Sequence, residues 1–234
     1  MQLTQTNNKI SGFHHLAICT GDIKGQIDFF TDKLGMELQS MYWMHGVPDT
    51  WHAFLRLNDE SSIAFVSNPQ IKQIPTELGH THSGNPGANS AAGTMQHVAL
   101  KVDSYDELLD MRDRLRTKGV PVLGPMDHGM CFSIYFAGLE NLSLELAFSA
   151  EALDQDMWID TEVTKLAGIS PEELKKYKKP KEFKGQKGAV PQPELDDTKG
   201  PHMTNYPPGV YEKSMQLPDD FVLNMVESTP PGKS

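Results

Sequence analysis

The stretch His14-His15-Leu16-Ala17-Ile18 returns 82 residues later as Gln96-His97-Val98-Ala99-Leu100. Each copy is an apolar run with one histidine at the same place, and each leads to a helix pattern behind a capping residue. A glycine ends each predicted helix, Gly35 in the first copy and Gly119 in the second. A period of about 80 residues predicts an internal repeat, and therefore two similar units packed on each other.

Each copy has the pattern of a strand, a helix and three further strands. In the first copy, a helix is predicted at 23–33 behind Asp22, with strands at 13–20, 36–44, 51–57 and 63–66. In the second, Ser104 and Glu107 form a capping box ahead of a helix that ends near Lys118. The strands predicted there are 94–102, 120–123, 131–136 and 142–148.

These patterns divide the chain into five segments. They are a loose N-terminus at 1–11, a first module at 12–67, an inter-module loop at 68–93, a second module at 94–150 and a Pro/Lys-rich C-terminal extension at 151–234. Ten of the 16 prolines lie in the extension, which is too poor in apolar residues to build its own core. It is either a disordered tail or an arm that wraps the domain or a partner subunit. The arm is favoured by its apolar residues Tyr206, Tyr211, Phe221, Val222 and Leu223.

Composition excludes several classes of function. The net charge of −10 argues against binding to nucleic acid. No apolar run is long enough to span a bilayer, and the polar N-terminus does not resemble a signal peptide. The two cysteines, Cys19 and Cys131, do not suggest a disulfide framework, so we expect a reduced, cytoplasmic setting.

Two histidines and one carboxylate on strands suggest a metal site. Glu145 lies within the apolar run Leu144-Glu145-Leu146-Ala147, where an unpaired carboxylate would be costly. Strand alternation gives His15, His97 and Glu145 mostly small neighbours on their own faces, while larger apolar residues occupy the opposite faces. Taken singly, each histidine reads more simply as a hydrogen-bonded core residue, and Glu145 as a surface residue. The repeat favours a site, because it places equivalent histidines in both modules.

These features resemble the vicinal oxygen chelate superfamily, which includes glyoxalase I, type I extradiol dioxygenases, fosfomycin-resistance enzymes and bleomycin-binding proteins. The resemblance covers about residues 10–150. It implies an α+β fold in which two βαβββ modules form paired curved mixed sheets around a metal cavity. In the superfamily, the first strand of each module and the last strand of the second supply metal ligands, which here are His15, His97 and Glu145.

Further residues resemble the extradiol dioxygenases within that superfamily. The isomerases commonly take a fourth ligand from the last strand of module one, where this chain has Ala64. The extradiol signature places a histidine before an aliphatic-tyrosine pair and a glutamate ten residues after the tyrosine, matching His128, Tyr135 and Glu145. Met126 and the turn Gly138-Leu139 depart from that signature, and both departures lie outside its chemical groups. An acid–base histidine is expected about fifteen residues before the second ligand, at His82, with His80 as the alternative.

The resemblance implies an Fe(II)-dependent extradiol-type dioxygenase that opens the ring of a catechol-like aromatic with O2, in aromatic compound catabolism. His82 would exchange protons, while His128 and Tyr135 would hydrogen-bond substrate oxygens. Mn(II), Ni(II) or Zn(II) are alternative metals. Two other functions stay open: a non-redox metal enzyme, either an isomerase or a thiol transferase, and a metal-free binding protein of the same fold. Exposed sheet edges favour a homo-oligomer, a dimer or higher. Trp43 and His45 share a predicted face and are candidates for a flat pocket wall.

Overall fold

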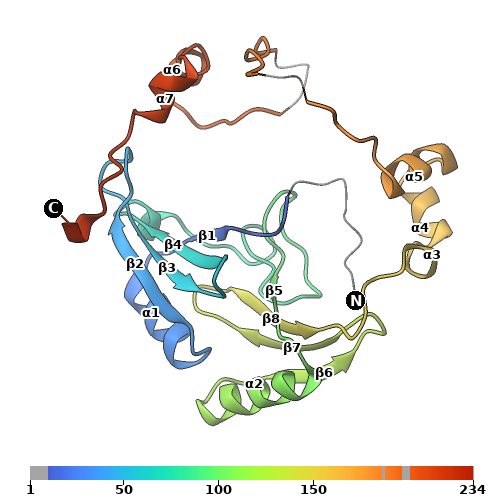
Figure 1. Ribbon diagram of the computed structural model, residues 1–234. Coiled ribbons are helices and arrows are strands. Elements are labelled where there is room, and N and C mark those ends of the chain that lie inside the picture. Colours follow the sequence, from blue (N-terminus) through green and yellow to red (C-terminus); the bar gives the residue numbers. More distant parts are fainter. Residues whose placement is uncertain (1–9, 186–187, 197–200, 234) are drawn as a thin grey trace.

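The computed structural model describes residues 10–185, 188–196 and 201–233. Most of the predicted N-terminal segment, residues 1–9, lies outside the described residues. Figure 1 shows two mixed sheets that meet at an angle, each with one helix on its outer side. The predicted pair of βαβββ modules and the α+β class are therefore confirmed.

The first module follows its predicted pattern closely. Its sheet has the order β1-β4-β3-β2, with β1 parallel to β4 and the other pairs antiparallel. The Asp22 side chain caps its helix, and Gly35 follows the helix with a φ of 79°. The elements are β1 (His15–Cys19), α1 (Ile23–Asp32), β2 (Glu37–Trp43), β3 (Trp51–Arg56) and β4 (Ser62–Ser67).

The second module repeats this plan with the order β5-β8-β7-β6. Ser104 caps its helix, and Gly119 follows that helix with the same φ of 79° as Gly35. One predicted strand is displaced: the chain pairs at Leu123–Asp127 instead of 120–123. The elements are β5 (Val98–Lys101), α2 (Tyr105–Thr117), β6 (Leu123–Asp127), β7 (Phe132–Ala137) and β8 (Ser143–Phe148).

One apolar core joins the two modules on their helix-covered sides. It includes Phe30 and Phe65 of the first module and Leu108 and Ile134 of the second, all at most 1% exposed. Leu16 and Ile18 of β1 pack against this core, while Ala17 and Cys19, which point to the other face of the strand, are exposed. The opposite, concave faces of both sheets are therefore the ones left for a site.

Polar contacts also tie the modules together. In the β7–β8 turn, Glu140 accepts hydrogen bonds from the Thr20 hydroxyl at 2.6 Å, the Gly21 amide at 2.8 Å and the Gln26 side-chain amide at 2.9 Å. On α2, the Arg114 guanidinium donates to backbone carbonyls at the end of α1. The two helices and the turn therefore contribute to the interface between the modules.

Outside the modules the chain forms short helices. The inter-module loop contains η1 (Ile71–Gln73). The described parts of the extension begin after β8, lie along the open side of the molecule and end near β2 (Figure 1). Its helices are α3 (Gln155–Trp158), α4 (Thr161–Leu166), α5 (Pro171–Lys178), α6 (Val210–Ser214), α7 (Asp219–Leu223) and η2 (Pro231–Lys233). In the described part of the chain, every helix is too short or too polar to cross a membrane.

Candidate metal centre

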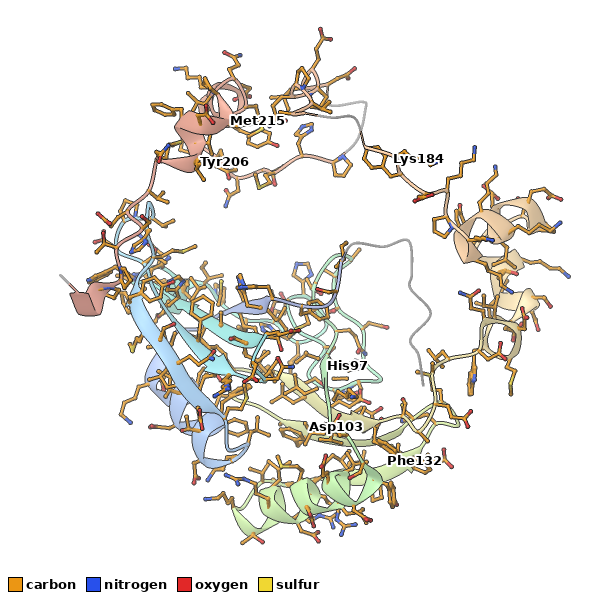
Figure 2. The ribbon with its side chains drawn as sticks, viewed as in Figure 1. His97, Asp103, Phe132, Lys184, Tyr206 and Met215 are labelled. Carbon is orange, nitrogen blue, oxygen red and sulfur yellow. The ribbon has the colours of Figure 1, made fainter. Side chains whose placement is uncertain are left out.

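Glu145 lies in the middle of the second sheet. On one side it pairs with Ala99 of β5, and on the other with Tyr135 of β7. Only 6% of its side chain is exposed, and its Oε2 atom lies 3.0 Å from Nε2 of His97. Figure 2 shows His97 on the side of the sheet away from α2. Of the predicted ligands, the structure therefore brings His97 and Glu145 together.

Gln96 fixes which nitrogen of His97 carries a proton. The side-chain NH2 of Gln96 donates to the carbonyl oxygens of Pro86 and Ala88, which can only accept hydrogen bonds. Its Oε1 atom therefore faces Nδ1 of His97, and because an amide oxygen can only accept, a hydrogen bond between them places a proton on Nδ1. In a neutral imidazole, Nε2 then presents a lone pair towards Glu145.

This arrangement suits a cation. A neutral His97 and an ionised Glu145 present two electron-pair acceptors to each other, which is unfavourable when nothing positive lies between them. A divalent cation bound by both atoms, or a second proton on the imidazole, satisfies them. An imidazole that donates its other N–H to a carbonyl oxygen is also the usual arrangement of a metal-ligating histidine. The chemistry of His97, Glu145 and Gln96 therefore fits a metal ion.

His128 and Tyr135 lie beside this pair. The Tyr135 hydroxyl is 2.9 Å from Nε2 of His128, and the rings of Tyr135 and His97 are 6.4 Å apart. Burial raises the pKa of the Tyr135 phenol, and the nearby Glu145 carboxylate raises it further, although a hydrogen bond with Ser133 opposes them. The phenol therefore keeps its proton at neutral pH and is available as a hydrogen-bond donor.

His15 lies on the concave face of the other sheet. Its Nδ1 atom is 2.9 Å from Nδ1 of His14, and its ring meets the Phe54 ring edge-on at 5.5 Å. It borders a cavity of about 480 Å³ with Tyr42 and Phe54, whereas His97 borders another, of about 450 Å³. Among the described residues, no three His, Cys, Asp or Glu side chains lie close enough together to hold a metal ion. The predicted three-ligand site is therefore assembled only in part.

Aromatic side chains of β2 and β3, among them the predicted cluster members His52 and Phe54, surround His15. The His52 ring packs between Tyr42 at 4.3 Å and Phe54 at 4.9 Å, and its Nε2 atom is buried without a hydrogen-bond partner. Burial lowers the pKa of His52, with smaller contributions from His45 and His15. The pairing of β3 with β4 places Phe54 opposite Ala64 and His52 opposite Val66. Both rings therefore lie on the same face of the sheet as His15.

The expected wall of Trp43 and His45 is different in the structure. Trp43 packs edge-on against Trp51, and Trp51 shares its face of β3 with the fully buried Ala53. His45 instead contacts Tyr42, whose ring centroid lies 5.4 Å away. The two residues therefore do not form one wall, because β2 ends at Trp43 and the chain turns before His45.

The candidate acid–base histidines come from the inter-module loop. His82 hydrogen-bonds the Thr81 hydroxyl at 2.9 Å and borders a cavity of about 650 Å³. That cavity and the one at His97 share Leu16 and Met95 in their walls, so they adjoin each other. His80 is exposed, and its carbonyl accepts from the Ala91 amide. The structure therefore places His82, but not His80, at a cavity next to the His97 pair.

Ala64 occupies the position at which the resembling isomerases commonly carry a fourth metal ligand. It lies between Ala17 of β1 and Phe54 of β3 in the register of the first sheet, and only 1% of it is exposed. A methyl group cannot bind a metal ion. On the concave face of β4, the chain therefore offers no carboxylate at this position to join His15.

Comparison with known proteins identifies one family. The sequence profile described as "Glyoxalase/Bleomycin resistance protein/Dioxygenase superfamily" matches residues 12–156. No curated protein matches the chain. Similar solved structures include a glyoxylase/bleomycin resistance protein/dioxygenase domain from Frankia sp. EAN1pec, at 16% identity and a TM-score of 0.45, covering 60% of this chain and 98% of that one.

Two further structures are similar at the same level. Lactoylglutathione lyase from Agrobacterium tumefaciens is 16% identical with a TM-score of 0.42, covering 64% of this chain and 98% of that one. The fosfomycin resistance protein FosX from Listeria monocytogenes is 19% identical with a TM-score of 0.41, covering 60% and 95%. These similarities concern the fold, and they assign no substrate to this chain.

Proposed function

The chain belongs to the Glyoxalase/Bleomycin resistance protein/Dioxygenase superfamily, and from that premise we propose that it is a metal-dependent enzyme for a small molecule with two adjacent oxygen atoms. More specifically, we propose an Fe(II)-dependent extradiol-type dioxygenase that acts on a catechol-like aromatic. The observation that carries this proposal is the contact between His97 and Glu145, two acceptor groups held 3.0 Å apart beside Tyr135 and His128.

The metal ligands in this proposal are His97, Glu145 and His15. A bound divalent cation would supply Lewis-acid activation of the two substrate oxygens. Two imidazoles and a carboxylate leave coordination positions on the metal open. Because Ala64 supplies no fourth ligand, these positions stay open, and such an open site suits Fe(II). Mn(II), Ni(II) and Zn(II) are the alternative ions.

The remaining residues bind the substrate and move its protons. Tyr135 keeps its phenolic proton and donates a hydrogen bond to a substrate oxygen, while His128 holds the Tyr135 hydroxyl in place. His82 is the proposed base and then acid, reaching the substrate from the adjoining cavity. Tyr42 and Phe54 beside His15 give an aromatic surface on which a flat ring can pack.

Completion of the site requires His15 to approach His97 and Glu145. We propose that the concave face of a first module closes over the concave face of a second module, either within one chain or between two copies. The strands β1 and β5 stand at the ends of their sheets, where their free edges are available for pairing. This supports a homo-oligomer, which sedimentation analysis with and without metal would test. The free thiols of Cys19 and Cys131 suit a cytoplasmic location.

A non-redox metal enzyme of the same superfamily, either an isomerase or a thiol transferase, is the second candidate, because it can use the same three ligands. Tyr135, held in place by His128, favours the dioxygenase, since it supplies a hydrogen bond to an oxygen of a catechol. A metal-free binding protein is the third candidate, and the facing acceptors of His97 and Glu145 argue against it.

Oxygen uptake separates these functions. The purified chain would be loaded anaerobically with Fe(II) and mixed with a panel of substituted catechols in an oxygen-electrode cell. We expect oxygen consumption with at least one catechol and a coloured ring-opened product, and loss of both in Tyr135→Phe. Metal binding without oxygen uptake on any vicinal diol would support the non-redox enzyme instead. Failure to bind metal would support the binding protein.

A further inference from the structure

The end of the chain lies beside β2, the edge strand of the first sheet (Figure 1). Side chains alternate across this strand, so Met41 and Trp43 share one face and Tyr42 lies on the other. Trp43 pairs with Trp51 of β3, and the two rings meet edge-on at 5.6 Å. Trp43 is 65% exposed and Met41 50%. These residues, Met41, Trp43 and Trp51, form an apolar surface at the edge of the first module, here named the tryptophan surface.

Two apolar residues near the C-terminus contact this region. Pro231 borders a cavity of about 590 Å³ that is otherwise lined by Tyr42 and the tryptophan surface. Segments that contain proline commonly dock on grooves lined by aromatic side chains. Val226 lies over Gly46 in the loop between β2 and β3, where a Cβ atom on the glycine would be 2.9 Å from Cγ1 of Val226. The valine therefore occupies space that a side chain at Gly46 would need.

An acidic residue stands next to Val226. The Oε1 atom of Glu227 accepts a hydrogen bond from the backbone amide of Thr229 at 2.6 Å. Hydrogen bonds from Thr229 lower the pKa of this carboxyl, and the nearby His45 lowers it further. The carboxylate is therefore ionised at neutral pH and lies close to a ring that becomes cationic when it is protonated.

From these contacts we propose that the tryptophan surface and the adjoining β2–β3 loop form a docking site for residues 225–233 of the same chain. The site takes an apolar side chain at Gly46, a carboxylate near His45 and a proline ring at the indoles. Because Trp43 remains largely exposed, the contact is small, and the segment leaves and returns by local opening. The contacts lie at the edge of the first sheet and involve none of the proposed metal ligands, so the docking site does not rest on the proposed function.

A covalently attached segment has an advantage over a free partner. It stays near its site at a high effective concentration, so a weak contact is occupied without any second molecule. Once that segment is removed, the empty site should accept the same segment as a free peptide. This exchange distinguishes a docking site from a chance approach of the chain end.

The three tryptophans of the chain report on the site through their indole N–H signals in an NMR spectrum, which single Trp→Phe variants assign. Trp43 and Trp51 belong to the surface, whereas Trp158 lies in the extension at the end of α3. We expect removal of residues 225–234 to shift the signals of Trp43 and Trp51 and to leave that of Trp158 in place. A synthetic peptide of residues 225–234, titrated into the truncated chain, should move both signals back until they saturate.

Substitutions test each part of the contact. A peptide that carries Val226→Asp should bind at least about fivefold more weakly, because a charge would replace the apolar group at Gly46. In the full-length chain, Pro231→Ala should shift both surface signals. Pro208→Ala, at the second proline of the pair Pro207-Pro208, is the matched control and should shift neither.

Three results would overturn the docking site. One is that truncation leaves the Trp43 and Trp51 signals unchanged, and another is that the peptide does not move them back. The third is a full-length spectrum that approaches the truncated one on dilution, which would show that the segment comes from a second copy. Among the described residues, the buried core side chains lie between Phe30 and Leu146, so the truncation removes none of them. No step uses metal or substrate, so the enzyme proposal can fail without changing this result.

Discussion

Nε2 of His97 lies 3.0 Å from Oε2 of Glu145, while Nδ1 of the same ring faces the side-chain oxygen of Gln96. The ring therefore stands between two oxygen acceptors, and Gln96 is itself held by two backbone carbonyls. A core histidine needs only satisfied hydrogen bonds, and a neutral ring cannot satisfy both contacts. The arrangement therefore requires either a second proton on the ring or a cation held between Nε2 of His97 and Oε2 of Glu145, and metal titration separates the two.

Gln96→Leu removes the acceptor that orients His97. Partners of this kind typically contribute 10–100-fold to metal affinity, and we expect a loss of about that size. Titration with Fe(II) under anaerobic conditions, followed by calorimetry, measures it. Gln39→Leu, on β2 of the other module, is the control. If both variants bind metal as the wild type does, Gln96 has no role in orienting a ligand.

His14 and His15 form a matched pair for testing the third ligand. Both are exposed and adjacent in sequence, and only His15 belongs to the proposed ligand set. His15→Asn should weaken metal binding at least about tenfold, while His14→Asn removes only a hydrogen-bond partner of His15 and should weaken it less. The same calorimetric titration applies. Equal effects of the two substitutions would mean that the site does not include the first module.

The raised pKa of Tyr135 predicts that its phenol loses its proton at a higher pH than an ordinary tyrosine does. Because folding raises this pKa, its contribution to stability is present below the unfolded value of 10.0 and is lost as the pH rises through the folded value. Ultraviolet absorbance should show one tyrosine that titrates later than the others and is absent in Tyr135→Phe. Tyr177→Phe, at an exposed residue of the extension, should leave the late step intact. Loss of the late step in Tyr177→Phe instead would contradict the assignment.

Glu140 should make stability depend on pH. Burial alone would raise its pKa, but hydrogen bonds from Thr20, Gln26 and Gly21 outweigh burial and lower it. Its contribution is therefore present above the unfolded value of 4.5 and is lost as the pH falls through the folded value.

Glu140→Gln should lower the free energy of unfolding by roughly 1 kcal/mol at pH 7, a low figure for a charged acceptor because the side chain is exposed. The loss should shrink as the pH falls below about 4.5. Urea denaturation at several pH values measures it. Glu60→Gln, in the equivalent turn of the first module, is the control, and an equal loss there would argue against a specific contact between modules.

The fold was predictable because the repeat supplied each element twice. Strand alternation placed Ala17 and Cys19 on the His15 face and Leu16 and Ile18 against the core, as observed. The displaced strand β6 contains Gly124-Pro125, a pair that normally interrupts strands. It is tolerated there because β6 is an edge strand, whose outer side needs no backbone donor.

The site was predictable only within each sheet. Alternation and pairing place Glu145 beside Tyr135 on one face, and the predicted residues His97 and His128 lie beside them in the structure. The separation between the two concave faces depends on how the modules pack, and contacts such as those of Glu140 do not follow from strand patterns. The position of His82 likewise depends on the path of a long loop, which is held partly by the hydrogen bond from Ser83 to the Gln96 carbonyl.

Metal binding by the wild type and by Glu145→Gln tests the central claim most directly. The substitution keeps the size of the side chain and removes the charge that faces His97. Equilibrium titration with Fe(II), and with Mn(II) and Zn(II) for comparison, should give one ion per chain for the wild type and an affinity at least about 100-fold lower for the variant. A wild type that binds none of these ions, or a variant that binds them equally well, would contradict the claim that His97 and Glu145 hold a metal.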